Sequence, residues 1–151
     1  MFAGGSVGVR AYRHRFRRID RRVVAATREL IAARPWRGNP GRGGPAEREA
    51  AKGAFLEWLG LASAVYGIRT PNLAVGGTRT AGFYVPDTNL IVLPKFSVFT
   101  LLHEFRHAWQ CQKGIKVGDE EDARGWSVSL VYLADPRFYW NAVRKGLVFY
   151  A

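Results

Sequence analysis

The residues of this chain that are best suited to chemistry stand in one short run, His103-Glu104-Phe-Arg-His107. Two histidines four residues apart lie one turn apart on the same face of a helix, so both imidazoles can bind one Zn²⁺ ion. The glutamate between them can reach a water molecule beside such an ion and accept its proton. We therefore expect Nε2 of His103 and Nε2 of His107 to converge on one point, with Glu104 as the general base of a hydrolytic site.

The helix that would carry these histidines has a separate apolar face. At about 100° per residue, one stripe contains the apolar positions Val98, Leu101, Leu102, Phe105, Ala108 and Trp109. His103 and His107 lie outside this stripe, with Thr100 and Gln110 beside them, whereas a core histidine would lie within it. The alternative is a pair of solvent-exposed histidines on an ordinary amphipathic helix. Cys111 shares the histidine face, but eight residues displace it by about 12 Å from His103, too far to bind the same ion.

A third ligand is expected from the acidic run 119–122, which opens the next predicted helix. Glu120 lies at one edge of that helix's apolar side and is the expected ligand; Asp122, at the opposite edge, is the alternative, and Glu121 points away. The other interpretation is that these acids only cap the helix and interact with its dipole. In a tight antiparallel hairpin a later residue would lie opposite His107. Glu120 therefore reaches the metal only if the first helix ends early or the connection turns back along it.

Sequence patterns around these residues predict an α+β fold in which N-terminal helices and a small antiparallel sheet of two or three strands precede the two site helices. Helices are expected at 16–34, 46–66, 98–113 and 120–134, and strands at 82–85 and 89–93. The expected helix ends are marked by Gly67, Ser97, Gly114, Asp119 and Asp135-Pro136. The segment 35–45 holds four Gly and three Pro, which favours a loop. We therefore divide the chain into a basic N-terminal helix and loop, residues 1–45, and a core at 46–151.

The composition indicates a folded chain of one domain. Its 151 residues, with 48% hydrophobic and 23% charged, suffice for a buried core and exclude a wholly disordered protein. No apolar run approaches the roughly 18 residues that a membrane span needs, and the N-terminus becomes arginine-rich before any apolar stretch of signal-peptide length. The single cysteine, Cys111, cannot close an internal disulfide, so a reducing cytoplasm is the expected location.

Positive charge is concentrated in the N-terminal third of the chain. Residues 1–53 contain 13 Lys and Arg and 4 acids, a net charge of +9 out of +11 for the whole chain. Such a segment attracts nucleic acid, acidic protein or anionic lipid, and the expected recruitment surface consists of Arg17, Arg18, Arg21 and Arg22. The alternative is a solvated basic helix without a partner.

The stretch 101–110, followed by Glu120-x-x-Ala123, resembles the gluzincin metallopeptidases. The plan of residues 68–134, with strands ahead of the HExxH helix, is similar to the minigluzincin core and to the SprT-like and ImmA-like peptidase domains. This resemblance implies a zincin-like fold with His103, His107 and Glu120 as zinc ligands and Glu104 as general base. It also implies that the edge of the strand at 82–85 or 89–93 receives an extended substrate.

An oxyanion-stabilising residue is expected in such enzymes, and Tyr84 and Tyr132 are the candidates, although a packed tyrosine is the alternative for each. The sequence thus predicts a zinc metallopeptidase acting on a protein or peptide substrate. The alternatives are a basic nucleic-acid-associated or assembly protein with a degenerate or structural HExxH, or a SprT-like protease recruited to nucleic acid.

Overall fold

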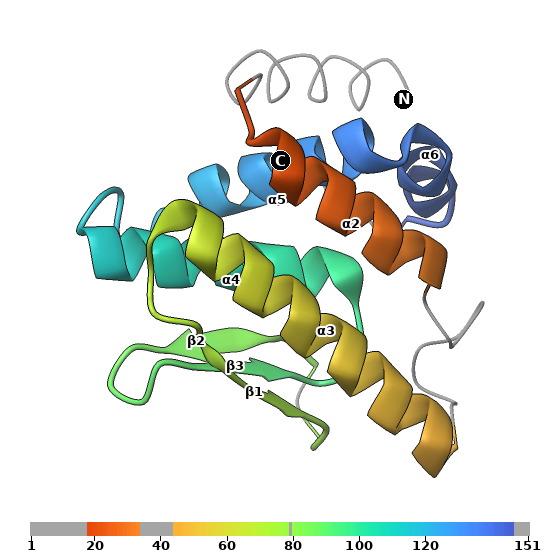
Figure 1. The fold of residues 1–151 in the computed structure, drawn as a ribbon, viewed down its shortest axis with the longest axis horizontal. Helices are drawn as coiled ribbons and strands as arrows, with labels where there is room; N and C mark the ends of the chain where they lie inside the picture. Colours follow the sequence, from red (N-terminus) through yellow and green to blue (C-terminus); the bar gives the residue numbers. More distant parts are fainter. Residues whose placement is uncertain (1–17, 34–43, 79, 147–151) are drawn as a thin grey trace.

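The computed structural model describes residues 18–33, 44–78 and 80–146. Within these residues, five helices and a three-stranded sheet form an α+β fold, as the sequence patterns predict (Figure 1). Helix α4 (Val98–Lys113) contacts the sheet on one side and α5 (Glu120–Ala134) on another, so it lies between the sheet and α5. No helix in the described part of the chain is long and apolar enough to cross a membrane.

The ends of α4 and α5 coincide with the capping residues of the sequence. Ser97 accepts a hydrogen bond from the backbone N–H of Thr100 at 3.4 Å, and Gly114, with φ of 68°, ends α4 in the left-handed conformation. Asp119 begins α5 by accepting a hydrogen bond from the backbone N–H of Asp122 at 2.9 Å. Both predicted site helices are therefore confirmed at both ends.

The sheet contains three short strands, β1 (Asn72–Val75), β2 (Phe83–Val85) and β3 (Leu90–Leu93), in the order β1-β3-β2. β2 and β3 are antiparallel, with Tyr84 opposite Ile91, which confirms the predicted pairing of these two segments. β1 is parallel to β3, with Leu73 opposite Ile91, so the prediction of an antiparallel sheet is wrong for β1. The physical reason is topological. The chain reverses its direction between β1 and β2 and again between β2 and β3, so β1 and β3 run the same way. Because β2 occupies one edge of β3, β1 pairs with the other edge.

Helices α2 (Arg21–Ala33) and α3 (Pro45–Tyr66) pack against each other. Their buried residues include Val23, Thr27, Leu30 and Ile31 of α2 and Phe55, Trp58, Leu59 and Ala62 of α3. The indole N–H of Trp58 donates to Oγ1 of Thr27 at 2.9 Å, which satisfies a buried polar pair. Gly67, with φ of 67°, ends α3 as predicted.

The predicted N-terminal helix begins at Arg21, and residues 16–17 and most of the predicted loop at 35–45 lie outside the described residues. α2 contacts α5 as well as α3, and Nε of Arg28 donates to the backbone carbonyl of Ala134 at 2.9 Å. The apolar side of α2 belongs to the same core cluster as the central strand and α4. The division of the chain at residue 45 stays a prediction.

Helix α6 (Pro136–Arg144) is not predicted by the sequence patterns, which indicate only the end of α5 at Asp135-Pro136. Asp135 does follow α5, but its side chain also accepts a hydrogen bond from the backbone N–H of Phe138 at 3.0 Å. Proline is tolerated in the first turn of a helix, where its missing N–H has no partner to lose. The same pair therefore ends one helix and begins the next.

The aromatic core joins the helices that carry the site. The ring of Phe105 in α4 contacts Trp58 of α3 at a centroid distance of 5.1 Å and Trp126 of α5 at 5.8 Å. Phe105 is fully buried, and large aromatic side chains contribute most to the free energy of such a core. These contacts fix the rotation of α4 about its axis and so determine which residues face away from the core.

Candidate metal centre

Helix α4 presents His103 and His107 on one side because its apolar stripe is buried on another. Of the six predicted stripe residues, Val98, Leu101, Leu102, Phe105 and Ala108 are buried, and Trp109 is half-buried. The side chains of His103 and His107 are 20% and 12% exposed, and their Nε2 atoms lie 3.2 Å apart. The expected convergence of the two imidazoles is therefore confirmed.

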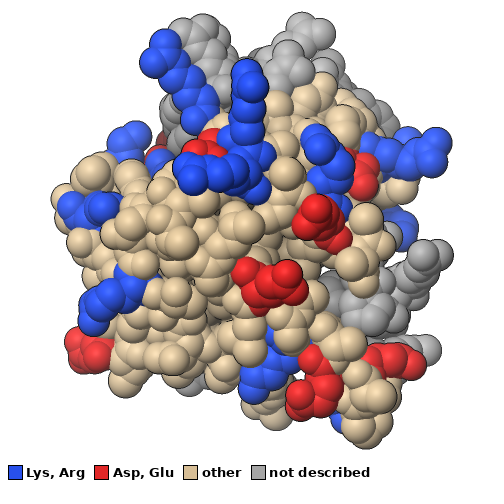
Figure 2. Space-filling model, in the orientation of Figure 1, with Lys and Arg blue, Asp and Glu red and all other residues tan. Residues whose placement is uncertain are grey.

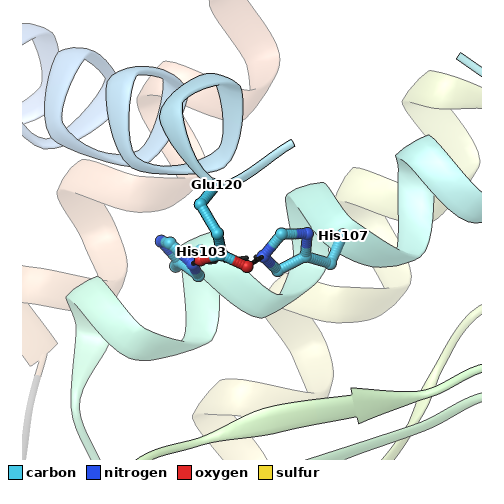
Figure 3. Close-up of side chains that lie close together, drawn as sticks. All are labelled: His103, His107 and Glu120. Atoms are coloured by element: carbon cyan, nitrogen blue, oxygen red, sulfur yellow. Dashed lines mark hydrogen bonds and ion pairs between the residues drawn. The ribbon is translucent and has the colours of Figure 1, made fainter. Parts of the chain in front are cut away.

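Glu120, the first residue of α5, lies over both histidines (Figure 3). Its Oε1 is 2.9 Å from Nε2 of His103, and its Oε2 is 2.8 Å from Nε2 of His107. The predicted acid is thus the one that faces the histidines. The geometry arises because the connection turns back along α4: the side-chain amide of Gln110, one turn after His107, donates to the backbone carbonyl of Asp119 at 2.9 Å.

The donor set of this cluster suits zinc. Nε2 of each histidine and a carboxylate oxygen of Glu120 all lie within 4.8 Å of one another. Ligand atoms about 2.0–2.2 Å from a tetrahedral Zn²⁺ stand about 3.3–3.6 Å apart, so the observed 2.8–3.2 Å separations need only a small outward shift. Two nitrogens and one carboxylate oxygen also match the three protein ligands of hydrolytic zinc sites, which keep a fourth position for water.

Glu104 lies beside this cluster at a cavity of about 710 Å³ that His103, His107 and Glu120 also line. It is 6% exposed. Burial raises the pKa of Glu104 to about 7; the electrostatic interaction with His107 opposes this rise, and the negative charge of Glu120 adds to it. Burial also lowers the pKa of His103 below its usual range, although the hydrogen bond to Glu120 acts in the opposite direction.

Strand β2 and the residue before it form one wall of the cavity, opposite the histidines on α4. Gly82, Phe83 and Tyr84 line it, and β2 lies at an edge of the sheet. A Cβ atom on Gly82 would lie 2.6 Å from Cγ2 of Thr100 and 3.1 Å from the carbonyl oxygen of Val92. Glycine at this position therefore lets the strand approach the start of α4 closely.

The two candidate oxyanion residues have different surroundings. Tyr84 lines the cavity, and its hydroxyl donates to Oδ1 of Asn89 at 2.7 Å. Tyr132 contacts the ring of Tyr139 edge to face, at a centroid distance of 5.4 Å, and is not among the residues lining the cavity. Of the two tyrosines, Tyr84 is therefore the one that lines the cavity.

Asp122, the alternative ligand, faces the side chain of Arg106 and not the histidines. Its side chain is 2% exposed, and Oδ2 accepts a hydrogen bond from Nε of Arg106 at 2.8 Å. Burial alone would raise the pKa of Asp122, but the hydrogen bonds from Arg106 and Gln110 outweigh it and hold the pKa below its usual range. Glu121 is exposed, as expected, and Cys111 lines the cavity without joining the cluster.

Sequence reasoning missed the roles of two residues at this site. Gln110, placed on the histidine face by the helical wheel, is completely buried, and its Oε1 lies 2.8 Å from Nδ1 of His107. Arg124 lines the cavity, and its positive charge contributes to the lowered pKa of His103. Its position four residues after Glu120, on the same side of α5, is the signal that would have identified it.

Comparisons of the chain with protein-family models, with curated proteins and with solved structures give no match.

Proposed function

We propose that this chain is a zinc metallopeptidase with a zincin-like fold of the gluzincin type. His103, His107 and Glu120 are the proposed zinc ligands, and Glu104 is the proposed general base. The observation that carries the proposal is the convergence of two imidazole nitrogens and one carboxylate at a cavity that Glu104 also lines. The resemblance of residues 101–110 and Glu120-x-x-Ala123 to gluzincins gives the same roles to the same residues.

The chain's own residues divide the work of peptide hydrolysis. When bound, zinc polarises a carbonyl group and makes water more acidic. Glu104 accepts a proton from the attacking water and delivers it to the nitrogen of the leaving amine. Tyr84 is the proposed hydrogen-bond donor to the oxygen that becomes negative during the attack, because Tyr84 lines the cavity and its hydroxyl would exchange Asn89 for the substrate.

The proposed substrate is an extended segment of a protein or peptide. β2 pairs with β3 along one edge, and within the described residues no strand pairs with its other edge. An edge strand can pair with an added strand through backbone N–H and C=O groups, and the cavity beside β2 gives room for substrate side chains. The substrate backbone would then pass between β2 and the histidines.

A second candidate function, recruitment to nucleic acid or an acidic partner, is favoured by the basic residues near the start of α2. Arg18, Arg21 and Arg22 are exposed, and Arg22 pairs with Asp20 at 2.9 Å; Arg17 lies outside the described residues. Lys and Arg side chains gather in the upper part of the face shown in Figure 2, where Figure 1 places α2, α5 and α6. A peptidase with this surface would act on proteins bound to the same polyanion. Without a competent metal site, the surface alone would make a binding or assembly protein.

We also propose the cytoplasm as the location of the protein. Cys111 is the single cysteine of the sequence, and it is a free thiol in the structure. A cytoplasm kept reducing suits a chain whose fold uses no disulfide.

The test of the peptidase proposal joins metal content to hydrolysis. Purified protein is analysed for zinc by mass spectrometry and assayed on casein and on a peptide library. The Glu104→Gln variant is the control that we expect to be inactive. We expect one zinc per chain in both proteins and hydrolysis by the unsubstituted protein alone. A chain that binds no zinc, or a Glu104→Gln variant as active as the parent, would contradict the proposal.

A further inference from the structure

A buried chain of polar contacts lies behind His107, on the side away from the cavity. Nδ1 of His107 is 2.8 Å from Oε1 of Gln110. The side-chain nitrogen of Gln110 donates to Oδ2 of Asp122 and to the backbone carbonyl of Asp119, both at 2.9 Å. Gln110 and Asp122 are 0% and 2% exposed, so this chain of contacts is shielded from water.

The two acceptors around Gln110 determine which way its amide group points. A carboxylate and a carbonyl both require a donor, so the amide nitrogen must face Asp122 and Asp119. The amide oxygen is then the atom that faces His107, and an oxygen can only accept a hydrogen bond. Nδ1 of His107 must therefore carry the proton, and Nε2 is the nitrogen available to the ligand cluster.

Asp122 is itself held in place by cationic groups. Arg106 donates to it through Nε at 2.8 Å and Nη2 at 3.3 Å, and Nζ of Lys116 lies 3.8 Å from Oδ1. The guanidinium of Arg106 stacks over Trp109 at 3.8 Å from the ring centroid and lies 5.4 Å from the centroid of Trp126. These contacts keep Asp122 as an acceptor of fixed position.

From this geometry we infer that Gln110 is a positioning residue for the metal site: it fixes the tautomer and ring orientation of His107, and Asp122 with Arg106 fixes the orientation of Gln110. Its effect on zinc affinity rests on the proposed function, whereas its effect on the tautomer does not. Outer partners that orient ligating histidines contribute about 10–100-fold to metal affinity. Asp122 thus acts at the site through the bonds behind His107 and not as a ligand.

His103 supplies an internal comparison, because within the described residues its hydrogen bonds go to Glu120 and His107 through Nε2 alone. Gln112, two residues after Gln110, supplies the matched substitution. Its side chain bonds the backbone of Arg69 and the side chain of Asn89, so it is an amide of the same helix that does not contact His107.

The test reads the proton of His107 directly, by long-range ¹H–¹⁵N NMR of the metal-free protein at neutral pH. In the parent and in Gln112→Met, we expect Nδ1 of His107 to carry a proton. In Gln110→Met, which keeps the side-chain volume but removes the acceptor, we expect the neutral ring to move its proton to Nε2, beside Glu120. The spectra should show the same protonation of the His103 ring in all three proteins. A parent protein in which Nδ1 of His107 is unprotonated overturns the inference without any variant.

Zinc affinity, measured by competition with a chelator, gives the second readout. We expect Gln110→Met to weaken zinc binding about 10–100-fold and Gln112→Met to leave it unchanged. Equal affinities of the parent and Gln110→Met would overturn the positioning role. A parent that binds no zinc yet shows the expected tautomers would overturn the proposed function alone.

Discussion

The Nε2 atoms of His103 and His107 lie 3.2 Å apart, although one full turn of α4 separates the two residues. Their rings meet at 74°, and one carboxylate, that of Glu120, lies within 2.9 Å of both nitrogens. Two imidazole lone pairs and a negative carboxylate directed at one place repel each other unless a proton or a cation lies between them. The arrangement therefore favours a bound cation, which the first two predictions address.

Replacing His107 with alanine should abolish stoichiometric zinc binding, because two protein ligands hold the ion far more weakly than three. The measurement is zinc per chain by mass spectrometry after gel filtration. Cys111→Ser is the matched control, since Cys111 lines the cavity but is not part of the cluster, and it should keep one zinc. Loss of zinc from the cysteine variant alone would mean that the ion binds elsewhere in the cavity.

Chelation should lower the melting temperature of the parent protein. A metal that binds only the folded state, at 100 times its dissociation constant, stabilises that state by about 2.7 kcal/mol. For a chain of this length, such a change in the free energy of unfolding corresponds to about 5–10 °C. Calorimetry with and without EDTA measures it, and His103→Ala should show no response to zinc. A similar zinc response in both proteins would count against a site that includes His103.

Replacing Glu104 with glutamine should reduce peptide hydrolysis by about 10²–10⁴-fold while zinc content and folding remain as in the parent, because an amide keeps the shape but accepts no proton. Initial rates on one fluorogenic peptide give the comparison. Glu121→Gln is the control, because Glu121 is an exposed residue near the site and does not line the cavity. Unchanged rates in Glu104→Gln would remove Glu104 from the mechanism.

The local parts of the site could be predicted from the sequence because they depend on short spacings. Four residues of helix place His103 over His107, and capping by Asp119 places Glu120 in the first turn of α5. The choice of Glu120 over Asp122 follows from which edge of the apolar side each occupies. What the sequence could not show is that Arg106 lies opposite Asp122, because that contact joins two helices whose relative position depends on the whole core.

Contacts between elements distant in the sequence also explain why the pairing of β1 and the role of Gln110 were not predicted. The parallel pairing of β1 with β3 joins segments about 18 residues apart, and no local pattern encodes which edge of β3 a strand takes. Gln110 could be placed on the histidine face of α4, but its two acceptors come from the start of α5. Its role as a positioning residue depends on the connection between α4 and α5, which brings the start of α5 back beside Gln110.

Replacing Asp122 with alanine should destabilise the fold by about 3–5 kcal/mol, because Arg106, whose side chain is 12% exposed, would lose its carboxylate partner. The amide of Gln110 would lose one of its two acceptors in the same variant. Urea unfolding followed by tryptophan fluorescence measures the change. Glu121→Ala, one residue earlier on the exposed side of α5, should cost less than about 1 kcal/mol. Equal costs for the two variants would show that the buried ion pair contributes no more than an exposed acid does.

Replacing Arg17, Arg18, Arg21 and Arg22 together with glutamine should weaken binding to duplex DNA and flatten its dependence on salt. Each arginine that neutralises a phosphate contributes about −0.9 to the log-log slope, so the slope becomes less steep as contacts are lost. Fluorescence anisotropy of a labelled duplex at several salt concentrations measures it. The arginines at 18, 21 and 22 are exposed, whereas the apolar side of α2 is buried, so the fold and the cleavage of a short neutral peptide should be unaffected.

The control for this last variant carries the same loss of charge at four exposed residues in α3 and in two loops: Arg48, Lys52, Arg69 and Lys95. If the arginines act through their position, the slope should change strongly in the variant of Arg17, Arg18, Arg21 and Arg22 and only slightly in the control. Equal changes would mean that net charge alone attracts the DNA. Absence of binding at low salt, to duplex and to single strands alike, would mean that these four arginines are only solvated, and the proposed peptidase would then need another way to reach its substrates.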